Sequence, residues 1–350
     1  MKSVCVIPQV SGVGGMVSFR ANFIAGLEAR GIEVSHDLRL TTFDSMLVIG
    51  GTRHIPGLWN ARRRGVRIVQ RLNGMNWLHR LQHTGVKHFL RAEYGNLILR
   101  TIRARLADHI VYQSEFAHQW WERTYGPTPV PHSVIHNAVD LNTYTPSPQS
   151  TKQISPSYQL PIDHYRLLLV EGSLMGGYEL GLESAVKLTE LLNARYLDQF
   201  GKPAGLLVAG RVSDEVKAQW AHKTHIPLVW AGLVSHEQIP ALDRSAHLLY
   251  SSDINAACPN SVIEALACGL PVLAFDTGAL PELVTGNAGR VVPYGGDPWQ
   301  LELPDVPALA EAAIEILSDQ PRFRIAARNL AEESFGLDQM VDAYLYVLKG

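Results

Sequence analysis

The sequence predicts an α/β protein built from two doubly wound, Rossmann-like domains. Short apolar strands alternate with amphipathic helices in both halves of the chain, and a segment rich in Pro, Ser and Thr separates the halves. The length of 350 residues fits two domains of ordinary size, each with its own core. Ligands bind such sheets beyond the carboxyl ends of the strands, so we expect the two domains to face a central cleft.

The first domain is expected at residues 1–150. Its strands are predicted at residues 4–7, 45–50, 67–72, 109–113 and 133–136. Gly12, Gly14 and Gly15 follow the first strand and precede a helix that Gly31 ends. A second helix, at about 86–107, has a stripe that we expect to be buried: Phe89, Leu90, Tyr94, Leu97, Ile98 and Ile102.

The second domain is expected at residues 160–335, after a linker from Tyr144 to Pro161. Its strands are predicted at residues 166–170, 205–209, 228–230, 247–250 and 271–275. Phe335 and Gly336 interrupt the helical pattern, so a final helix is predicted as a separate element within 337–350.

The stretch from Cys258 to Val284 is the most informative part of the chain. Asn260 and Ser261 are residues that often cap helices, and Glu264 lies one turn further on. A helix start preceded by small residues offers free backbone N–H groups and attracts anions. Glu264 is placed to accept hydrogen bonds from the two hydroxyls of a ribose. The alternative is an ordinary strand–helix unit without a ligand.

This stretch resembles the signature of the retaining family-four glycosyltransferases, two-domain enzymes of the GT-B fold. Glu264 stands at the second glutamate of their motif and is followed by Ala-Leu-Ala-Cys-Gly-Leu-Pro-Val, Gly278 and Glu282. The first glutamate of the motif is replaced by Ala256. In this family the final helix, here within 337–350, packs back on the first domain.

The resemblance implies a nucleotide-sugar donor, with UDP as the expected nucleotide. It places the base near Val234 and His236, the ribose on Glu264, and the phosphates at Asn260 and Ser261. Gly14 and Gly15 would face the donor phosphates and the reacting sugar. Asn73 stands where many members carry a histidine near that sugar.

The family's two diphosphate-binding cations are missing. Ser173 stands in place of the arginine and Gly176 in place of the lysine. Arg211, at another predicted strand end, is the best-placed substitute, and the alternative is a plain surface arginine. We therefore expect Asn73, Gly15 and Arg211 at the reacting centre.

The predicted activity is transfer of a sugar from a nucleotide donor, with retention, to a hydroxyl of a glycan or lipid-linked acceptor. No Asp-x-Asp motif is present, so the resemblance implies an enzyme that needs neither a metal nor another cofactor. The rival prediction is a catalytically silent GT-B protein that binds a nucleotide or a partner subunit. The missing cations and the missing first glutamate favour this rival.

Charge is unevenly distributed, although the net charge is only −2. Residues 53–105 contain 12 Lys and Arg but one acid, Glu93, whereas the rest of the chain holds 19 basic and 32 acidic residues. Such a basic region suits an anionic membrane or a polyprenyl-diphosphate-linked acceptor, or it is only a solvated face. No nucleic-acid-binding module accompanies it, so nucleic acid is not an expected partner.

Composition predicts a soluble protein of the cytoplasm. Hydrophobic residues make up 46% of the chain, and no apolar run approaches the roughly 18 residues of a membrane span. The first apolar run is too short for a signal peptide and reads as a strand. Peripheral contact with the inner face of the membrane follows from the basic region.

Overall fold

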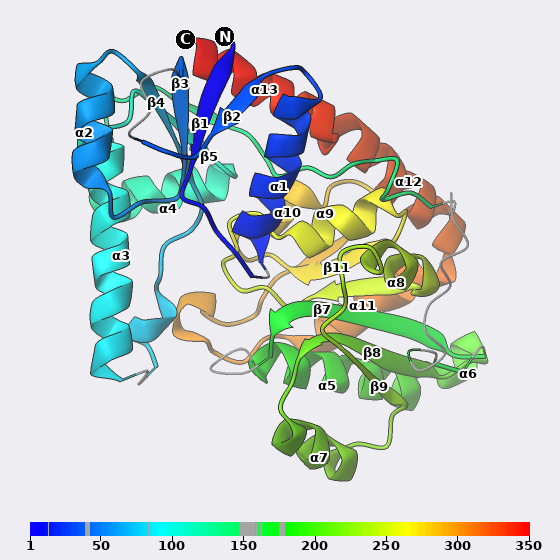
Figure 1. Cartoon of the computed structure of the whole chain (residues 1–350). Coiled ribbons are helices and arrows are strands. Elements are labelled where there is room, and N and C mark those ends of the chain that lie inside the picture. Colours follow the sequence, from blue (N-terminus) through cyan, green and yellow to red (C-terminus); the bar gives the residue numbers. More distant parts are fainter. Residues whose placement is uncertain are drawn as a thin grey trace. The chain divides into compact units, whose positions relative to one another are not determined.

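The computed structural model describes residues 1–12, 14–38, 43–82, 85–146, 158, 160–161, 163–174 and 179–350. The chain forms two compact units (Figure 1): unit 1 comprises Met1–Ala138 and Gly336–Gly350, and unit 2 comprises Val139–Phe335. Residues 139–146 were expected in the first domain but belong to unit 2, because Arg328 donates hydrogen bonds to the carbonyls of Leu141 and Tyr144. Most of the expected linker, 147–157, lies outside the described residues.

Unit 1 is built on a six-stranded parallel sheet of order β2-β1-β3-β4-β5-β6. Its strands are β1 (Ser3–Ile7), β2 (Glu33–Ser35), β3 (Ser45–Ile49), β4 (Arg67–Leu72), β5 (His109–Tyr112) and β6 (His132–Val134). The short polar strand β2 was not predicted, because it lacks an apolar run. The chain goes from β1 to β2 and then crosses to β3 on the other side of β1. The strand order therefore reverses between β1 and β3.

Helices cover both faces of this sheet. The described helices of unit 1 are α1 (Gly15–Glu28), α2 (Ile55–Arg63), η1 (Leu78–Arg80), α3 (Val86–Arg105), α4 (Glu115–Tyr125) and α13 (Leu337–Lys349). Val4 and Val6 of β1 join the core shared with α1 and α13, whereas Cys5 and Ile7 join the core shared with α2 and α3. This is the alternation expected of a strand buried on both sides. Tyr344 of α13 packs against Phe19 and Phe23 of α1, with ring centroids 5.3 and 5.2 Å away.

The prediction that the apolar stripe of α3 is buried was wrong for most of its residues. Phe89, Leu90, Tyr94 and Leu97 are 41%, 62%, 50% and 54% exposed. Ile102 is fully buried in the core with α2, whereas Ile98 is half-buried beside Gly51. Only one edge of the predicted stripe therefore faces the sheet, and the remaining apolar side chains form a surface.

Unit 2 contains a second six-stranded parallel sheet, of order β12-β11-β10-β7-β8-β9. Its strands are β7 (Tyr165–Ser173), β8 (Ala204–Arg211), β9 (Leu228–Gly232), β10 (Leu248–Ser251), β11 (Val272–Phe275) and β12 (Gly289–Val292). Strand β12 was not predicted. The chain builds β8 and β9 on one side of β7, then β10 to β12 on the other, so the order reverses between β7 and β10.

Helices also cover both faces of the second sheet. They are α5 (Glu179–Arg195), α6 (Leu197–Phe200), α7 (Asp214–Lys223), α8 (Ile239–Ser245), α9 (Asn260–Ala267), α10 (Leu280–Leu283), η3 (Pro298–Gln300), α11 (Val306–Ser318) and α12 (Gln320–Ser334). Leu167 and Leu169 of β7 enter a core with α5 and α11. Helices α8 and α12 both pack on α9, which contacts β10 and β11.

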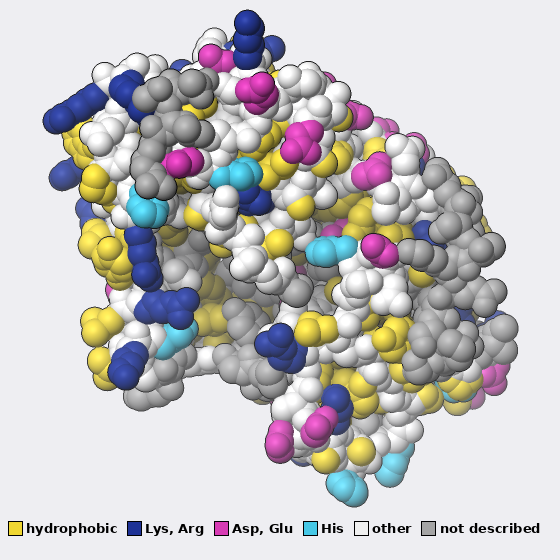
Figure 2. Space-filling view, in the orientation of Figure 1, with side chains coloured by type: hydrophobic (Ala, Val, Ile, Leu, Met, Phe, Trp, Pro, Cys, Tyr) yellow, Lys and Arg dark blue, Asp and Glu magenta, His cyan; other side chains and the backbone are white. Residues whose placement is uncertain are grey.

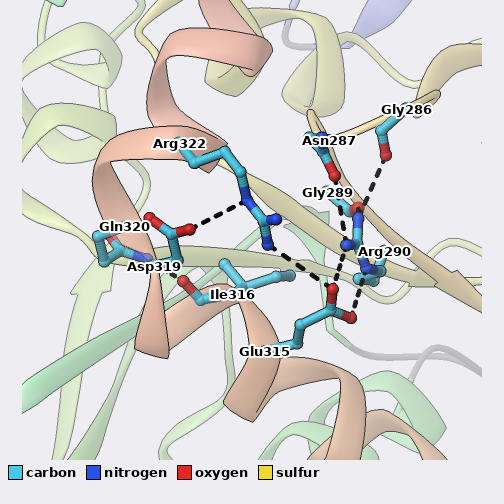
Figure 3. Close-up of polar contacts among 9 residues, drawn as sticks. All are labelled: Gly286, Asn287, Gly289, Arg290, Glu315, Ile316, Asp319, Gln320 and Arg322. Atoms are coloured by element: carbon cyan, nitrogen blue, oxygen red, sulfur yellow. Dashed lines mark hydrogen bonds and ion pairs between the residues drawn. The ribbon is translucent and has the colours of Figure 1, made fainter.

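An ion-pair cluster ties the edge strand β12 to the junction of α11 and α12 (Figure 3). Arg290 donates through Nε to Oε2 of Glu315 at 2.7 Å, and Arg322 lies near both Glu315 (3.8 Å) and Asp319 (3.1 Å). Arg290 holds the pKa of the Glu315 carboxyl below its usual value. Because the side chains are partly exposed, the cluster orients the helices more than it stabilises the unit.

In the described ranges, no helix combines the length and the hydropathy that crossing a bilayer requires.

Candidate functional site

The carboxyl ends of β7 and β10 carry two acids that sequence reasoning missed. Glu171 of β7 accepts a hydrogen bond from Oγ of Ser252 at 2.7 Å, and Asp253 follows β10. Burial raises the pKa of both carboxyls, and the charge of Asp253 raises that of Glu171 further. At neutral pH this edge is therefore less negative than two free carboxylates would make it. The signal available was their place after adjacent strands, where a doubly wound sheet binds ligands.

The loop between β10 and α9 is held by the turn after β11. Thr277 donates from Oγ1 to the carbonyl of Asp253 at 3.1 Å, and Ala256 accepts from the backbone of Ala279 at 2.9 Å. A Cβ on Gly278 would lie 2.5 Å from the carbonyl oxygen of Ala256, and the φ of Gly278 is +61°. This close approach explains why the motif needs glycine there. Ala256 supplies no carboxylate, so the first acid of the motif has no equivalent at that position.

Helix α9 begins at Asn260, with Pro259 as its N-cap and no capping side chain. Asn260 and Ser261 were expected as caps, but they are the first helical residues, and both are half-buried. Their backbone N–H groups belong to the first turn and have no partner within the helix. The positive end of the helix dipole lies at the same place. The anion site at this helix start stays a prediction from the sequence.

Glu264 lies one turn into α9 and is 7% exposed. Burial raises the pKa of its carboxyl to about 7, and a hydrogen bond with the hydroxyl of Tyr144 opposes that rise. Asp243 of α8 is buried beside it, and burial and the charge of Glu264 raise the pKa of Asp243 well above normal. Oδ2 of Asp243 has no hydrogen-bond partner among the described residues.

Tyr144 reaches Glu264 because the preceding residues form a fixed turn. Asp140 accepts hydrogen bonds from the backbone of Asn142 (3.0 Å) and from the hydroxyl of Thr143 (2.7 Å). Arg328 of α12 then donates to the carbonyl oxygen of Tyr144 at 2.7 Å. From the sequence, Tyr144 was predicted only as the start of the linker, so its contact with Glu264 is new.

Arg211 lies directly beside Ser173, which stands in place of the family arginine. The Cα atoms of the two residues are register partners on β7 and β8, and Leu174 donates a backbone hydrogen bond to Arg211 at 3.0 Å. Arg211 is exposed, and it forms no ion pair with another described residue. The structure thus places a cation next to the vacated position. Gly176, the position of the family lysine, lies outside the described residues.

Val234 and His236 follow β9 at the same edge of the sheet. Val234 is half-buried and His236 is exposed. The backbone of Gln238 donates to the carbonyl of Ser235 at 2.9 Å, which turns the chain into α8. Both residues therefore lie at a strand end, where the resemblance places the nucleotide base.

In unit 1, Asn73 lines a pocket of about 290 Å³ at the edge where the strand order reverses. Trp121 donates through Nε1 to the carbonyl of Asn73 at 2.8 Å, which fixes the backbone there. Gly14 is the N-cap of α1, with φ +139°, and Gly15 is its first residue. Met16, the next residue, lines the same pocket as Asn73.

Some of the basic residues of 53–105 are buried or paired, and the others are exposed. Arg71 is buried, with its guanidinium 3.7 Å from the ring centroid of Phe19, and Arg103 is buried against the hydroxyl of Tyr112 at 2.8 Å. Arg80 pairs with Glu93 at 2.7 Å. These arginines hold unit 1 together, so the surface charge is smaller than the sequence count implies.

The described part of the chain contains neither a metal-ligand cluster nor a disulfide. No group of three or more His, Cys, Asp or Glu side chains there is arranged to hold a metal ion. The three cysteines are buried and form no disulfide: Cys5, Cys258 and Cys268.

Comparisons with known proteins agree with this architecture. Residues 174–319 match the family model described as glycosyl transferases group 1. A lipopolysaccharide core biosynthesis mannosyltransferase, LpsB of Rhizobium meliloti (strain 1021), is 32% identical over 110 residues. That similarity spans 30% of this chain and 29% of the length of LpsB.

Solved structures resemble the whole chain. A sucrose-phosphate synthase (tll1590) from Thermosynechococcus elongatus has a TM-score of 0.72 at 15% identity, covering 100% of this chain and 98% of its own. Anabaena Alr3699/HepE, in complex with UDP and glucose, scores 0.68 at 14% identity with full coverage of both chains. WaaG, a glycosyltransferase involved in lipopolysaccharide biosynthesis, scores 0.65 at 14% identity, covering 99% and 100%. At these identities the likeness concerns the fold, which is GT-B. Together with the family match in unit 2, it supports a glycosyltransferase.

Proposed function

We propose that this protein is a glycosyltransferase that moves a sugar from a UDP-sugar to a hydroxyl of a glycan or lipid-linked acceptor. The observation that carries the proposal is unit 2, where the match to the glycosyl transferases group 1 model begins directly after β7 and includes β10 and the helix that follows it. A helix N-terminus, a buried glutamate and an exposed arginine lie at or after the carboxyl ends of β8 and β10: Asn260–Ser261, Glu264 and Arg211.

Each group has a chemical task in this proposal. Glu264 accepts the ribose hydroxyls, and the first turn of α9 binds the phosphates. Arg211 stabilises the negative charge that grows on the departing diphosphate. Val234 and His236 contact the base, while Asn73, Gly14 and Gly15 of unit 1 serve the reacting sugar. The transfer retains configuration, and the leaving phosphate takes the proton of the acceptor hydroxyl. It needs no metal, because Arg211 and the first turn of α9 offset the charge of the diphosphate.

The acceptor belongs to surface-glycan synthesis in this proposal. LpsB and WaaG are both described as acting in lipopolysaccharide biosynthesis, and HepE has been solved with UDP-glucose. The exposed cations of unit 1 suit a diphosphate-linked acceptor at the inner face of the membrane, where the protein would bind peripherally from the cytoplasm.

A catalytically silent nucleotide-binding protein is the second candidate. Three observations favour it: Ser173 lacks a cation, Ala256 lacks a carboxylate, and the acids Glu171 and Asp253 lie at the strand ends nearby. A silent protein would bind UDP without transferring or hydrolysing the sugar.

A thermal-shift screen of UDP-, GDP- and ADP-sugars, followed by assays of donor hydrolysis and transfer, tests both candidates. A ligand that binds the native state raises its stability, so we expect a UDP-sugar to raise the Tm most. Glu264→Ala should weaken UDP binding about tenfold or more, since each charged hydrogen bond contributes about 1.5–3 kcal/mol. The matched control is Glu311→Ala, an exposed acid of α11. Stabilisation by no nucleotide sugar would contradict both candidates, and binding without turnover would select the silent protein.

A further inference from the structure

A trough in unit 1 leads from the edge of the first sheet to helix α3. One end is the pocket of about 290 Å³ that contains Asn73. The other end is a pocket of about 420 Å³ beside His88 and Arg91 of α3. The two pockets share four lining residues: Arg53, Asn76, Gly95 and Ile98. We call the two pockets together the trough. Pockets of this size accommodate small ligands.

The floor of the trough is held by paired amides. Asn96, buried in α3, accepts hydrogen bonds from the backbone and the side chain of Asn76 at 3.0 and 3.2 Å and donates to the Asn76 carbonyl at 2.9 Å. A Cβ on Gly95 would lie 3.4 Å from Nδ2 of Asn76, so the helix backbone borders this amide pair closely. The trough is therefore a formed feature of the fold.

Two arginines of the trough are available to a ligand. Arg53 and Arg91 are exposed, and neither takes part in an ion pair between described residues. Guanidinium groups bind phosphate through paired N–H donors, which makes arginine well suited to a phosphate or diphosphate group. The trough therefore offers an anion site that no other part of the proposed mechanism uses.

An apolar ridge lies beside these arginines on the same helix. Val86, Leu90, Tyr94 and Leu97 recur at helical spacing and are 76%, 62%, 50% and 54% exposed. The ridge residue Tyr94 is three residues from Arg91 and four from Ile98, so the trough and the ridge are neighbours on α3. Figure 2 shows hydrophobic and basic side chains side by side along the edge where α3 lies in Figure 1. Tyr94 belongs to both features.

We propose that the trough binds the phosphate group of a lipid-linked acceptor, with its hydrocarbon chain along the ridge. A phosphate beside an apolar ridge is the arrangement that recognises an amphiphile whose head is anionic. The proposal deepens the proposed function, on which it rests for the identity of the acceptor. It also accounts for an exposed stripe that the sheet of unit 1 leaves uncovered.

Calorimetry on the full chain, without nucleotide sugar, tests the proposal with farnesyl phosphate, farnesol and inorganic phosphate as probes. We expect farnesyl phosphate to bind tighter than either other probe. The double variant Arg53→Ser/Arg91→Ser should weaken it about tenfold or more, because two charge-assisted contacts are lost. The control Lys87→Ser/Arg100→Ser removes the same amount of charge, from α3 outside the trough, and should leave affinity unchanged. Leu90→Asn/Leu97→Asn should reduce the affinity to that of inorganic phosphate.

Three results would overturn the proposal. If both double variants, Arg53→Ser/Arg91→Ser and Lys87→Ser/Arg100→Ser, lost the same affinity for farnesyl phosphate, only the net charge of the surface would matter. If inorganic phosphate or farnesol bound as tightly as farnesyl phosphate, the trough would not recognise an amphiphile. Displacement of the probe by phosphatidylglycerol vesicles at equal lipid concentration would assign the trough to bulk headgroups. Because no nucleotide is present, these outcomes are independent of whether the protein binds UDP.

Discussion

Glu264 links the proposed donor site to pH. Its pKa of about 7 means that the carboxylate, the form that accepts ribose hydroxyls, is lost as the pH falls below that value. The titratable groups that interact with it are Tyr144, Asp243 and Cys268. Among them the Tyr144 hydroxyl favours the charged form.

We therefore expect UDP affinity to fall as the pH decreases through about 7, and Tyr144→Phe to move that fall to higher pH. Removing the hydroxyl removes an interaction that lowers the pKa of Glu264, so protonation begins earlier. Calorimetric Kd values between about pH 6 and about pH 9 would show the shift. The control is Tyr294→Phe, a buried tyrosine whose hydroxyl donates to the Glu302 carbonyl at 2.6 Å. Superimposable profiles for Tyr144→Phe and wild type would limit Tyr144 to packing.

Arg211 tests whether a neighbouring cation replaces the lost one. Arg211→Ala should lower kcat roughly 10²–10³-fold and weaken UDP-sugar binding much less, because the charge on the leaving group grows in the transition state. Arg211→Lys should recover part of the loss, since a point charge replaces a fork. Lys223→Ala, an exposed cation of α7, is the control for net charge. A fully active Arg211→Ala would refute this compensation.

At the scale of the elements, the contact between α1 and α13 depends on one glycine. A Cβ on Gly26 would lie 2.5 Å from Cγ2 of Val341, so the two helices approach too closely for a larger residue. Gly26→Leu should cost about 1–3 kcal/mol of stability and lower the urea midpoint. Ala25→Leu, at the exposed neighbouring position, should have little effect. Adding Val341→Ala should restore part of the lost stability. An unchanged urea midpoint in Gly26→Leu would show that α13 shifts at little energetic cost.

Most elements could be predicted from sequence because apolar runs and helix signals were strong. The strands β1 and β11 are short apolar runs with turn residues after them, and both formed close to their expected bounds. β2 and β12 were missed because their residues are mixed and gain strand structure only by pairing with β1 and β11. The α3 stripe was wrong because periodicity identifies an apolar face without showing what covers it.

Candidate site residues could be named from sequence only where one motif contains them. The helix start at Asn260, Glu264 and Gly278 were found from local sequence, and their roles stay predictions. Glu171, Asp253 and Tyr144 were missed because strand order and a long-range turn bring them to the site. No local pattern encodes that proximity.

For the whole molecule, the uneven charge of the chain has a measurable consequence. Arg53, Arg63, Lys87, Arg91 and Arg100 are exposed cations of unit 1, and none forms an ion pair with another described residue. Arg62 forms an ion pair with Asp108, whose carboxylate oxygen lies 3.5 Å from the guanidinium. A net charge of −2 therefore conceals a cationic surface, which an anionic bilayer attracts over about one Debye length.

We expect the protein to bind vesicles that contain phosphatidylglycerol and to leave vesicles of phosphatidylcholine free. Binding should weaken between about 50 mM and about 500 mM salt, since exposed charges are screened. Replacing Arg62, Arg63 and Arg64 with Ser should reduce cosedimentation, because each cation near the surface contributes about 1 kcal/mol. Replacing Lys187, Lys217 and Lys223 of unit 2 makes the same change in net charge and should not. If both triple variants bind alike, or if lipid charge has no influence, the basic surface of unit 1 is only solvated, and the lipid-linked acceptor must be reached through the trough alone.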